Sequence, residues 1–244
     1  MVEKLALVLV VAGCSAHLDD HDVDGGNRDG NVGGDGSGSD TGVTCANGRT
    51  LYLNFEGVTL TKGAPSDAIT NRVSWMQNAT ATVPRYRTND VNRDGEIVSI
   101  INGVKARLAG TPINVVVGRP TSGPYVMIVF GGDQNIVGTI YSYATNEHDC
   151  GDPVKSDVGW ISDVPSVAIV ADLAIGTLGW GLGLNGTNDV NDCMCGWANG
   201  CMASAGACTL SASIASTASQ SPATTCPNQN PQNELAAFST GFCQ

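Results

Sequence analysis

The sequence predicts an α/β domain that is followed by a disulfide-rich tail. Runs of β-forming residues alternate with two segments of helical periodicity, which is typical of a sheet packed against helices. Of the 244 residues, 42% are hydrophobic and 14% are charged, as in a folded chain with a weakly charged surface. Six of the nine cysteines follow residue 192, so the C-terminal part is expected to be held by disulfides.

The first elements of the domain are a strand and a helix. Residues 51–55 (LYLNF) alternate apolar and polar side chains, as a half-buried strand does. The stretch from there to Pro84 is polar and has no clear pattern. The next segment ends at Gly110 and Pro112, and its apolar residues recur at helical spacing: Ile97, Ile100, Ile101, Val104 and Leu108.

Short strands and a long apolar helix follow. Pro165 opens the segment 166–184, which is long enough for a buried helix with proline in its first turn. Residues 232–242 predict a short closing helix. The remaining β-rich segments predict four strands, at 113–117, 125–130, 137–143 and 158–162. This order of elements favours an α/β sandwich.

The N-terminus predicts export and lipidation. Lys4 precedes an apolar run at residues 5–12, and the VAGC sequence at 11–14 resembles the lipobox of bacterial lipoproteins. The resemblance implies that a signal peptide, residues 1–13, is removed and that Cys14 carries a diacylglyceryl group. Ser15 then implies an outer-membrane location in the cell envelope. An ordinary signal peptide is the alternative.

Residues 14–44 predict a lipidated cysteine and a disordered tether. From residue 15 to 44 the chain is rich in Gly, Asp, Ser and Asn, with seven Asp against one Arg and almost nothing to bury. A Gly/Asp calcium-binding repeat is a weaker alternative, because one copy cannot stack. The folded domain is therefore expected at residues 45–244, with the cysteine-rich region beginning at about 193.

The cysteine count agrees with export. If Cys14 carries lipid, an even number remains, and an oxidising compartment is where such a set forms disulfides. The spacing does not determine the pairing, and it does not fit a C-x-x-C metal site. The disulfide candidates are Cys45, Cys150, Cys193, Cys195, Cys201, Cys208, Cys226 and Cys243.

The apolar segment can be aligned with a zinc-binding motif, but it lacks the histidines and the glutamate of that motif. At the spacing H-E-x-x-H-x-x-G-x-x-H, residues 172–194 offer only the glycine of the motif, and the five positions are Gly176, Thr177, Trp180, Gly183 and Gly186. This frame and the later Met194 resemble the metzincin zinc proteases. Over residues 51–194 the resemblance implies a mixed five-stranded sheet on two helices, with Met194 in the methionine turn.

The chemistry of that family requires three imidazoles on zinc and a glutamate base. Glycine offers no ligand, Trp180 has only an indole N–H, and Thr177 is no base near neutral pH. His17 and His21 lie in the tether and His148 lies far upstream, so no zinc site is expected to be rebuilt from them. No zinc is therefore expected, and the resemblance implies a pseudoenzyme.

Other interpretations of this segment remain open. Its glycines allow a buried helix without any metzincin ancestry. A transmembrane helix is a second alternative, because Gly179 and Gly183 form a GxxxG pair, although Asp172 and the oxidised tail oppose it. A different nucleophile is disfavoured, because the segment has no G-x-S-x-G sequence and no histidine partner.

A weak calcium site is a separate possibility. Asp90, Asn92 and Asp94 occupy calcium-loop positions one, three and five, but position twelve is Ile101 instead of glutamate. We favour a polar turn in which Asp94 caps the helix that follows.

The net charge of the chain limits the classes of partner that it can bind. The net charge of −11 excludes a nucleic-acid partner, which would need clustered Lys and Arg. The sequence thus predicts a lipid-anchored, inactive metzincin-like surface protein whose membrane contact is its anchor and whose cleft holds a peptide or protein ligand. A structural envelope lipoprotein without a specific ligand and a divergent active metalloprotease are the alternatives.

Overall fold

The computed structural model of the chain describes residues 48–139, 142–163, 165–197, 201, 206–217 and 225–243. All of them belong to one compact unit, Thr41–Gln244. The signal peptide, Cys14, the tether and Cys45 lie outside the described residues, so the expectations for them stay predictions.

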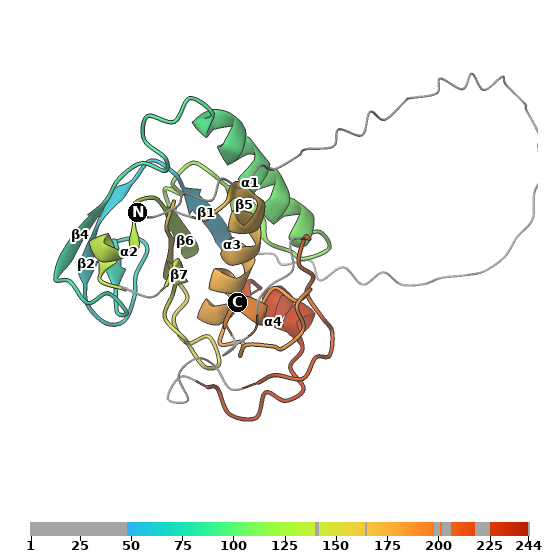
Figure 1. Cartoon of the computed structure of the whole chain (residues 1–244). Coiled ribbons are helices and arrows are strands. Elements are labelled where there is room, and N and C mark those ends of the chain that lie inside the picture. The colour runs from blue at the N-terminus through green and yellow to red at the C-terminus, as the bar shows by residue number, and fades with distance from the viewer. Residues whose placement is uncertain are drawn as a thin grey trace, which may run out of the picture. The chain divides into compact units, whose positions relative to one another are not determined.

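A mixed five-stranded sheet forms the centre of the fold (Figure 1). Its strand order is β5-β1-β6-β8-β7. Four strands run parallel, and only the edge strand β7 is antiparallel to its neighbour. Their bounds are β1 Thr50–Asn54, β5 Asn114–Val116, β6 Tyr125–Phe130, β7 Ala144–Thr145 and β8 Val158–Ile161. The fold class is therefore α/β with a mixed five-stranded sheet, as expected.

Two helices cover one face of this sheet. Helix α1 (Arg93–Arg107) has the predicted periodicity, and α3 (Val167–Gly181) is buried along most of its length. Both pack into one apolar core with β1 and β6. Asp172 of α3 forms a salt bridge with Arg107 of α1. This partner compensates the charge of Asp172, which is the one charged residue of α3 and is buried.

A smaller sheet covers the other face. Its strands are β2 (Val58–Lys62), β3 (Arg72–Val73) and β4 (Thr80–Val83), in the order β3-β2-β4. They enclose a second apolar core against the main sheet. The polar stretch before Pro84 is thus structured, which the sequence did not reveal. Its strands are short, and only one of the five residues of β2 and two of the four residues of β4 are buried, so the apolar signal is weak.

Because protein covers both faces of the main sheet, the first strand is more buried than the sequence predicts. We expected residues 51–55 to form a half-buried strand, but Leu51, Tyr52, Leu53 and Asn54 are all buried. Strand β1 lies inside the sheet between β5 and β6, so both of its faces are covered by protein.

Two further expectations are wrong in detail. The described part of the strand expected at 137–143, residues 137–139 and 142–143, is not in a strand: α2 (Gln134–Val137) occupies its start, and β7 begins at Ala144. Gly138, in the left-handed conformation, ends α2. Pro165 lies before the N-cap Ser166 instead of in the first turn of α3.

Helix α3 has 15 residues. Within the described part of the chain, no helix is both long enough and apolar enough to cross a bilayer. A membrane-spanning helix needs about 20 residues, which is more than the 15 of α3.

The tail wraps beside α3 and is held by disulfides. It contains the short 3-10 helix η1 (Cys195–Trp197) and the closing helix α4 (Glu234–Gly241). The side chain of Asn233 caps α4 by accepting a hydrogen bond from the Ala236 N–H at 2.8 Å. Of the candidate cysteines, the structure pairs Cys150 with Cys226, Cys193 with Cys208 and Cys195 with Cys201. Cys243 is also disulfide-bonded.

Candidate functional site

Helix α3 carries the positions of the incomplete zinc motif. Gly176 and Trp180, one turn apart, face the same neighbour, the indole of Trp197 in η1. A Cβ added at Gly176 would lie 2.2 Å from Trp197 Nε1. The rings of Trp180 and Trp197 stack with their centroids 5.0 Å apart. The indole of Trp197 therefore fills the space that a side chain at position 176 would need.

The other motif positions have structural roles. Thr177 is fully buried, and its Oγ1 donates to the Leu173 carbonyl 2.6 Å away within the same helix. Gly183 follows the end of α3 with φ +81°, which favours glycine, and the chain turns there. The buried Gly186 accepts a backbone hydrogen bond from Thr217 at 2.8 Å. None of these three residues offers a catalytic group.

Met194 lies directly beneath the helix. It is fully buried, and a Cβ added at Gly179 would lie 2.6 Å from its sulfur. The Met194 N–H donates to Asp192 Oδ1, and its carbonyl accepts from the Trp197 N–H. This turn presents Met194 to α3, and it brings Trp197 back over Gly176.

A cavity of about 510 Å³ opens beside Trp180. Its size is that of a small-molecule or side-chain site. Strand β7 and the residues that follow it form one wall, and α3 and η1 form another. The lining combines aromatic rings with hydroxyls, one amide and one carboxylate: Ser74, Trp75, Ser142, Tyr143, Ala144, Thr145, Asn146, Glu147, His148, Leu173, Trp180, Gly196 and Trp197.

His148 is the unexpected member of this site. It was expected to be remote from the motif, but its ring stacks on Trp180 with the centroids 3.7 Å apart and an angle of 14° between the planes. Trp180 thus stacks on both His148 and Trp197. Burial lowers the pKa of His148 below its usual value, while hydrogen bonding to the carbonyls of Leu184 and Gly183 acts in the opposite direction. The ring is therefore neutral near pH 7.

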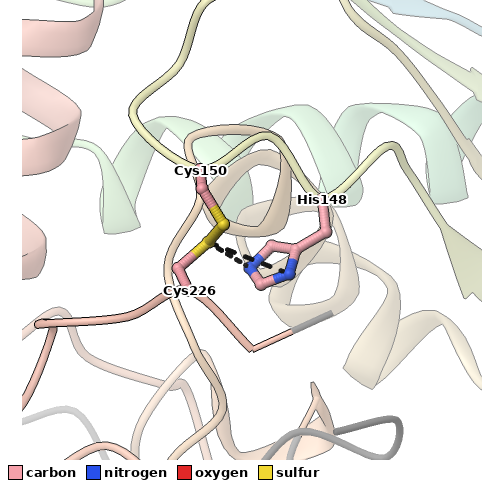
Figure 2. A group of neighbouring side chains, drawn as sticks. All are labelled: His148, Cys150 and Cys226. Carbon is pink, nitrogen blue, oxygen red and sulfur yellow. Dashed lines mark hydrogen bonds between the residues drawn. A yellow bond between two sulfur atoms is a disulfide. The ribbon is translucent and has the colours of Figure 1, made fainter. Parts of the chain in front are cut away.

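The other face of the site contains a disulfide. The sulfur of Cys226 lies 3.4 Å from His148 Nε2, and it is bonded to Cys150 (Figure 2). Within the described residues, His148, Cys150 and Cys226 are the group of His, Cys and acidic side chains whose geometry suits a metal ion. In the disulfide the sulfurs are not thiolates, so they are poor ligands in this state.

The acidic residue beside His148 is engaged elsewhere. Glu147 accepts a hydrogen bond from the Ser66 backbone N–H at 3.2 Å. Among the described residues that line the cavity, no hydroxyl is hydrogen-bonded to His148.

The calcium candidates surround the start of α1. Asn92 is the N-cap, and Asp94 lies within the first turn, so Asp94 is not the capping residue that we expected. Asp90 Oδ1 accepts the Asn92 backbone N–H at 2.9 Å, and Asp94 contacts Arg93. A carboxylate in the first turn still favours the helix through the helix dipole. Calcium binding at these residues stays a prediction.

Sequence reasoning missed Trp197, Tyr143 and the role of His148. A signal existed for two of them: histidine and tryptophan are scarce in this chain, with three and four copies. Their meeting depends on the loop after β7 and on the tail, which are far apart in sequence.

Comparison with known proteins does not identify this chain. No model of a protein family matches the sequence, and no curated protein matches it significantly.

Proposed function

We propose that the chain is a lipid-anchored, catalytically inactive metzincin-like protein that binds an extended peptide segment of another protein. The observation that carries this proposal is the placement of Trp180, at the position of a zinc-binding imidazole, on the wall of an open cavity. The mixed sheet on helices α1 and α3, and Met194 beneath α3, support the metzincin-like part.

The loss of catalysis is supported by the residues that fill the motif. Gly176 cannot ligate a metal, and the adjacent indole of Trp197 leaves no room for a side chain there. Thr177, at the position of the general base, is buried and donates to the helix backbone. A histidine at position 176 would have to displace Trp197, and a base at position 177 would have to replace a fully buried side chain.

The binding role is supported by the form of the cavity. An extended peptide can run beside the edge strand β7, whose one neighbour among the described strands is β8. The aromatic side chains and the hydroxyls of the cavity then supply a pocket for one of its side chains. No Lys or Arg is among the described residues that line the cavity, and Glu147 is, so a basic side chain is the favoured occupant.

Catalytic inactivity can be tested on the purified full-length protein without reductant. Metal analysis should find no stoichiometric zinc, and casein and peptide substrates should stay uncleaved with or without added zinc. One tightly held zinc per chain together with hydrolysis would contradict the proposal and favour a divergent metalloprotease.

Peptide binding can be tested with a displayed library of random extended peptides. Selected peptides should bind Tyr143→Ala at least tenfold more weakly than the unaltered protein, since Tyr143 lines the cavity and is 52% exposed. Val117→Ala is the matched control, because Val117 is 53% exposed and lies outside the cavity, and it should bind unchanged. Failure to select any peptide, or equal binding by both variants, would favour a structural lipoprotein.

A further inference from the structure

His148, Cys150 and Cys226 form a compact group of metal ligands beside the proposed peptide pocket, and of the three only His148 also lines that pocket. One ligand atom from each lies within 4.8 Å of the other two. Figure 2 shows the imidazole facing the Cys150–Cys226 disulfide. Two cysteines and one histidine, with one open position, are a ligand set that zinc accepts in proteins.

Cys226 is held in place without its disulfide. The side chain of Asn185 makes two hydrogen bonds to the Cys226 backbone, one with its N–H at 2.8 Å and one with its carbonyl at 2.9 Å. The backbone of Asn185 is itself bonded twice to the side chain of Gln232. Asn185, Cys226 and Gln232 are all buried, so these four hydrogen bonds are shielded from water.

Cys150 is held by the turn in which it lies. The Asp149 carbonyl accepts the Asp152 N–H at 2.8 Å, and the Asp149 carboxylate accepts the Val154 N–H. The end of α3 also packs against this turn: a Cβ added at Gly183 would lie 3.0 Å from the Cys150 Cα. Breaking the S–S bond therefore leaves both cysteines close to their present positions, with their Cα atoms 5.4 Å apart.

The imidazole is oriented for coordination. His148 Nε2 lies 3.1 Å from the Leu184 carbonyl, which accepts the Nε2 proton and leaves the lone pair on Nδ1. Nδ1 lies 4.0 Å from the Cys226 sulfur. Tetrahedral zinc, with bonds of about 2.05 Å to nitrogen and 2.3 Å to sulfur, would place these atoms about 3.6 Å apart. A shift of a few tenths of an ångström thus suffices for this pair of atoms. The two sulfurs, 1.99 Å apart in the disulfide, must separate to about 3.8 Å on tetrahedral zinc, so the cysteine side chains must rotate after reduction.

We propose that reduction of the Cys150–Cys226 disulfide creates a zinc site with His148, Cys150 and Cys226 as its protein ligands. An external dithiol supplies two electrons and two protons to the S–S bond, and it becomes a disulfide itself. Zn²⁺ then displaces one proton from each cysteine thiol and binds the two thiolates and Nδ1. Cys150 is an exposed residue, so a reductant can approach this end of the disulfide.

The test uses the full chain, reduced with a phosphine in the absence of oxygen and titrated with Co²⁺ as a spectroscopic probe. The reduced protein should bind one Co²⁺ with thiolate-to-metal absorption in the near ultraviolet and tetrahedral bands in the visible, and Zn²⁺ should displace it. The oxidised protein should show neither band. His148→Ala should weaken Co²⁺ binding at least tenfold.

Two double variants separate this site from the other thiols. Cys150→Ser with Cys226→Ser should abolish the bands, whereas Cys195→Ser with Cys201→Ser, which removes the same number of thiols, should retain them. Alkylation mapped by mass spectrometry gives a second measurement: Zn²⁺ should protect Cys150 and Cys226 but leave Cys195 and Cys201 reactive. Equal bands in both double variants, or no selective protection in the reduced protein, would overturn the proposal. Neither result depends on peptide binding.

Discussion

At the scale of the single residue, the close packing around Gly176 limits which side chains this position of α3 can accept. Alanine usually stabilises a helix interior by about 1 kcal/mol relative to glycine. Here the added Cβ would overlap Trp197 Nε1 at 2.2 Å and approach the Cys193 carbonyl at 2.8 Å. Overpacking of a buried site costs about 1–3 kcal/mol, so the overlap outweighs the helix preference.

We therefore expect Gly176→Ala to lower the free energy of unfolding by about 1–2 kcal/mol, measured by urea denaturation. Gly196→Ala is the control, because a Cβ added there meets nothing within 4 Å, and its stability should change little. A Gly176→Ala protein that is more stable than the unaltered one would show that Trp197 moves aside freely. Gly176→His should be worse than alanine, since its side chain is larger.

Asp157 makes the stability of the domain depend on pH. It is 1% exposed, and its Oδ1 has no hydrogen-bond partner among the described residues. Burial raises the pKa of Asp157 to about 8, and the nearby carboxylates of Asp149 and Asp152 act in the same direction. The folded protein thus holds a proton that the unfolded chain releases near pH 4.

The sign follows from this difference. Between about pH 4 and pH 8 the folded state binds more protons than the unfolded state, so stability should fall as the pH rises. Urea denaturation should give a higher midpoint at pH 5 than at pH 8. Asp157→Asn should make this slope shallower, and Asp94→Asn, at a side chain that is 96% exposed, should leave it unchanged. An unaltered slope in Asp157→Asn would contradict the assignment.

At the scale of the element, the tail depends on its cross-links. Cys193–Cys208 closes a loop of 15 residues and Cys195–Cys201 a loop of 6. Restriction of the unfolded chain grows slowly with loop length, and it predicts about 3 kcal/mol for the first and about 2 kcal/mol for the second. Replacing both cysteines of a pair by serine should lower the free energy of unfolding, and the loss should be larger for Cys193–Cys208 than for Cys195–Cys201. Reaction of these four cysteines with a thiol reagent in the folded protein would contradict the pairing.

The same tail shapes the site. The Cys193–Cys208 and Cys195–Cys201 bonds flank Met194 and Trp197, which pack against Gly179 and Gly176 of α3. Helix α3 is therefore held between the main sheet and a cross-linked turn. Loss of either disulfide is expected to loosen the wall of the cavity as well as the tail.

At the scale of the whole molecule, the expected lipid at Cys14 determines where the domain works. Replacing Cys14 with serine should leave the protein unlipidated and move it from the membrane fraction to the soluble fraction. Cell fractionation and intact mass measure the two effects. If both stay unchanged in the variant, the VAGC sequence is not a lipobox.

The layered architecture explains how the site is assembled from distant segments. The main sheet places the loop after β7, which carries Glu147 and His148, beside the end of α3. The tail then returns to cover α3, bringing Cys226 to His148 and Trp197 to Trp180. The cavity, the stacked rings and the disulfide therefore form one continuous region.

Local pattern alone determined several features of this protein. The periodicity of Ile97, Ile100 and Val104 predicted α1, and the β-rich run at 125–130 predicted β6, because both signals arise from neighbours along the chain. The even number of cysteines that remain beyond Cys14 predicted disulfides. The incomplete zinc-motif spacing pointed to Trp180, which lines the candidate site, but it did not reveal that Trp197 packs beside Gly176.

Tertiary structure decided the rest. The burial of both faces of β1, the second sheet and the start of β7 at Ala144 depend on which layers cover each segment. The meeting of His148 with Trp180 and Cys226 joins residues 32 and 78 positions apart, and no spacing rule encodes it. Contacts of this kind arise only when the whole chain packs, because their free energy comes from burial shared by distant segments.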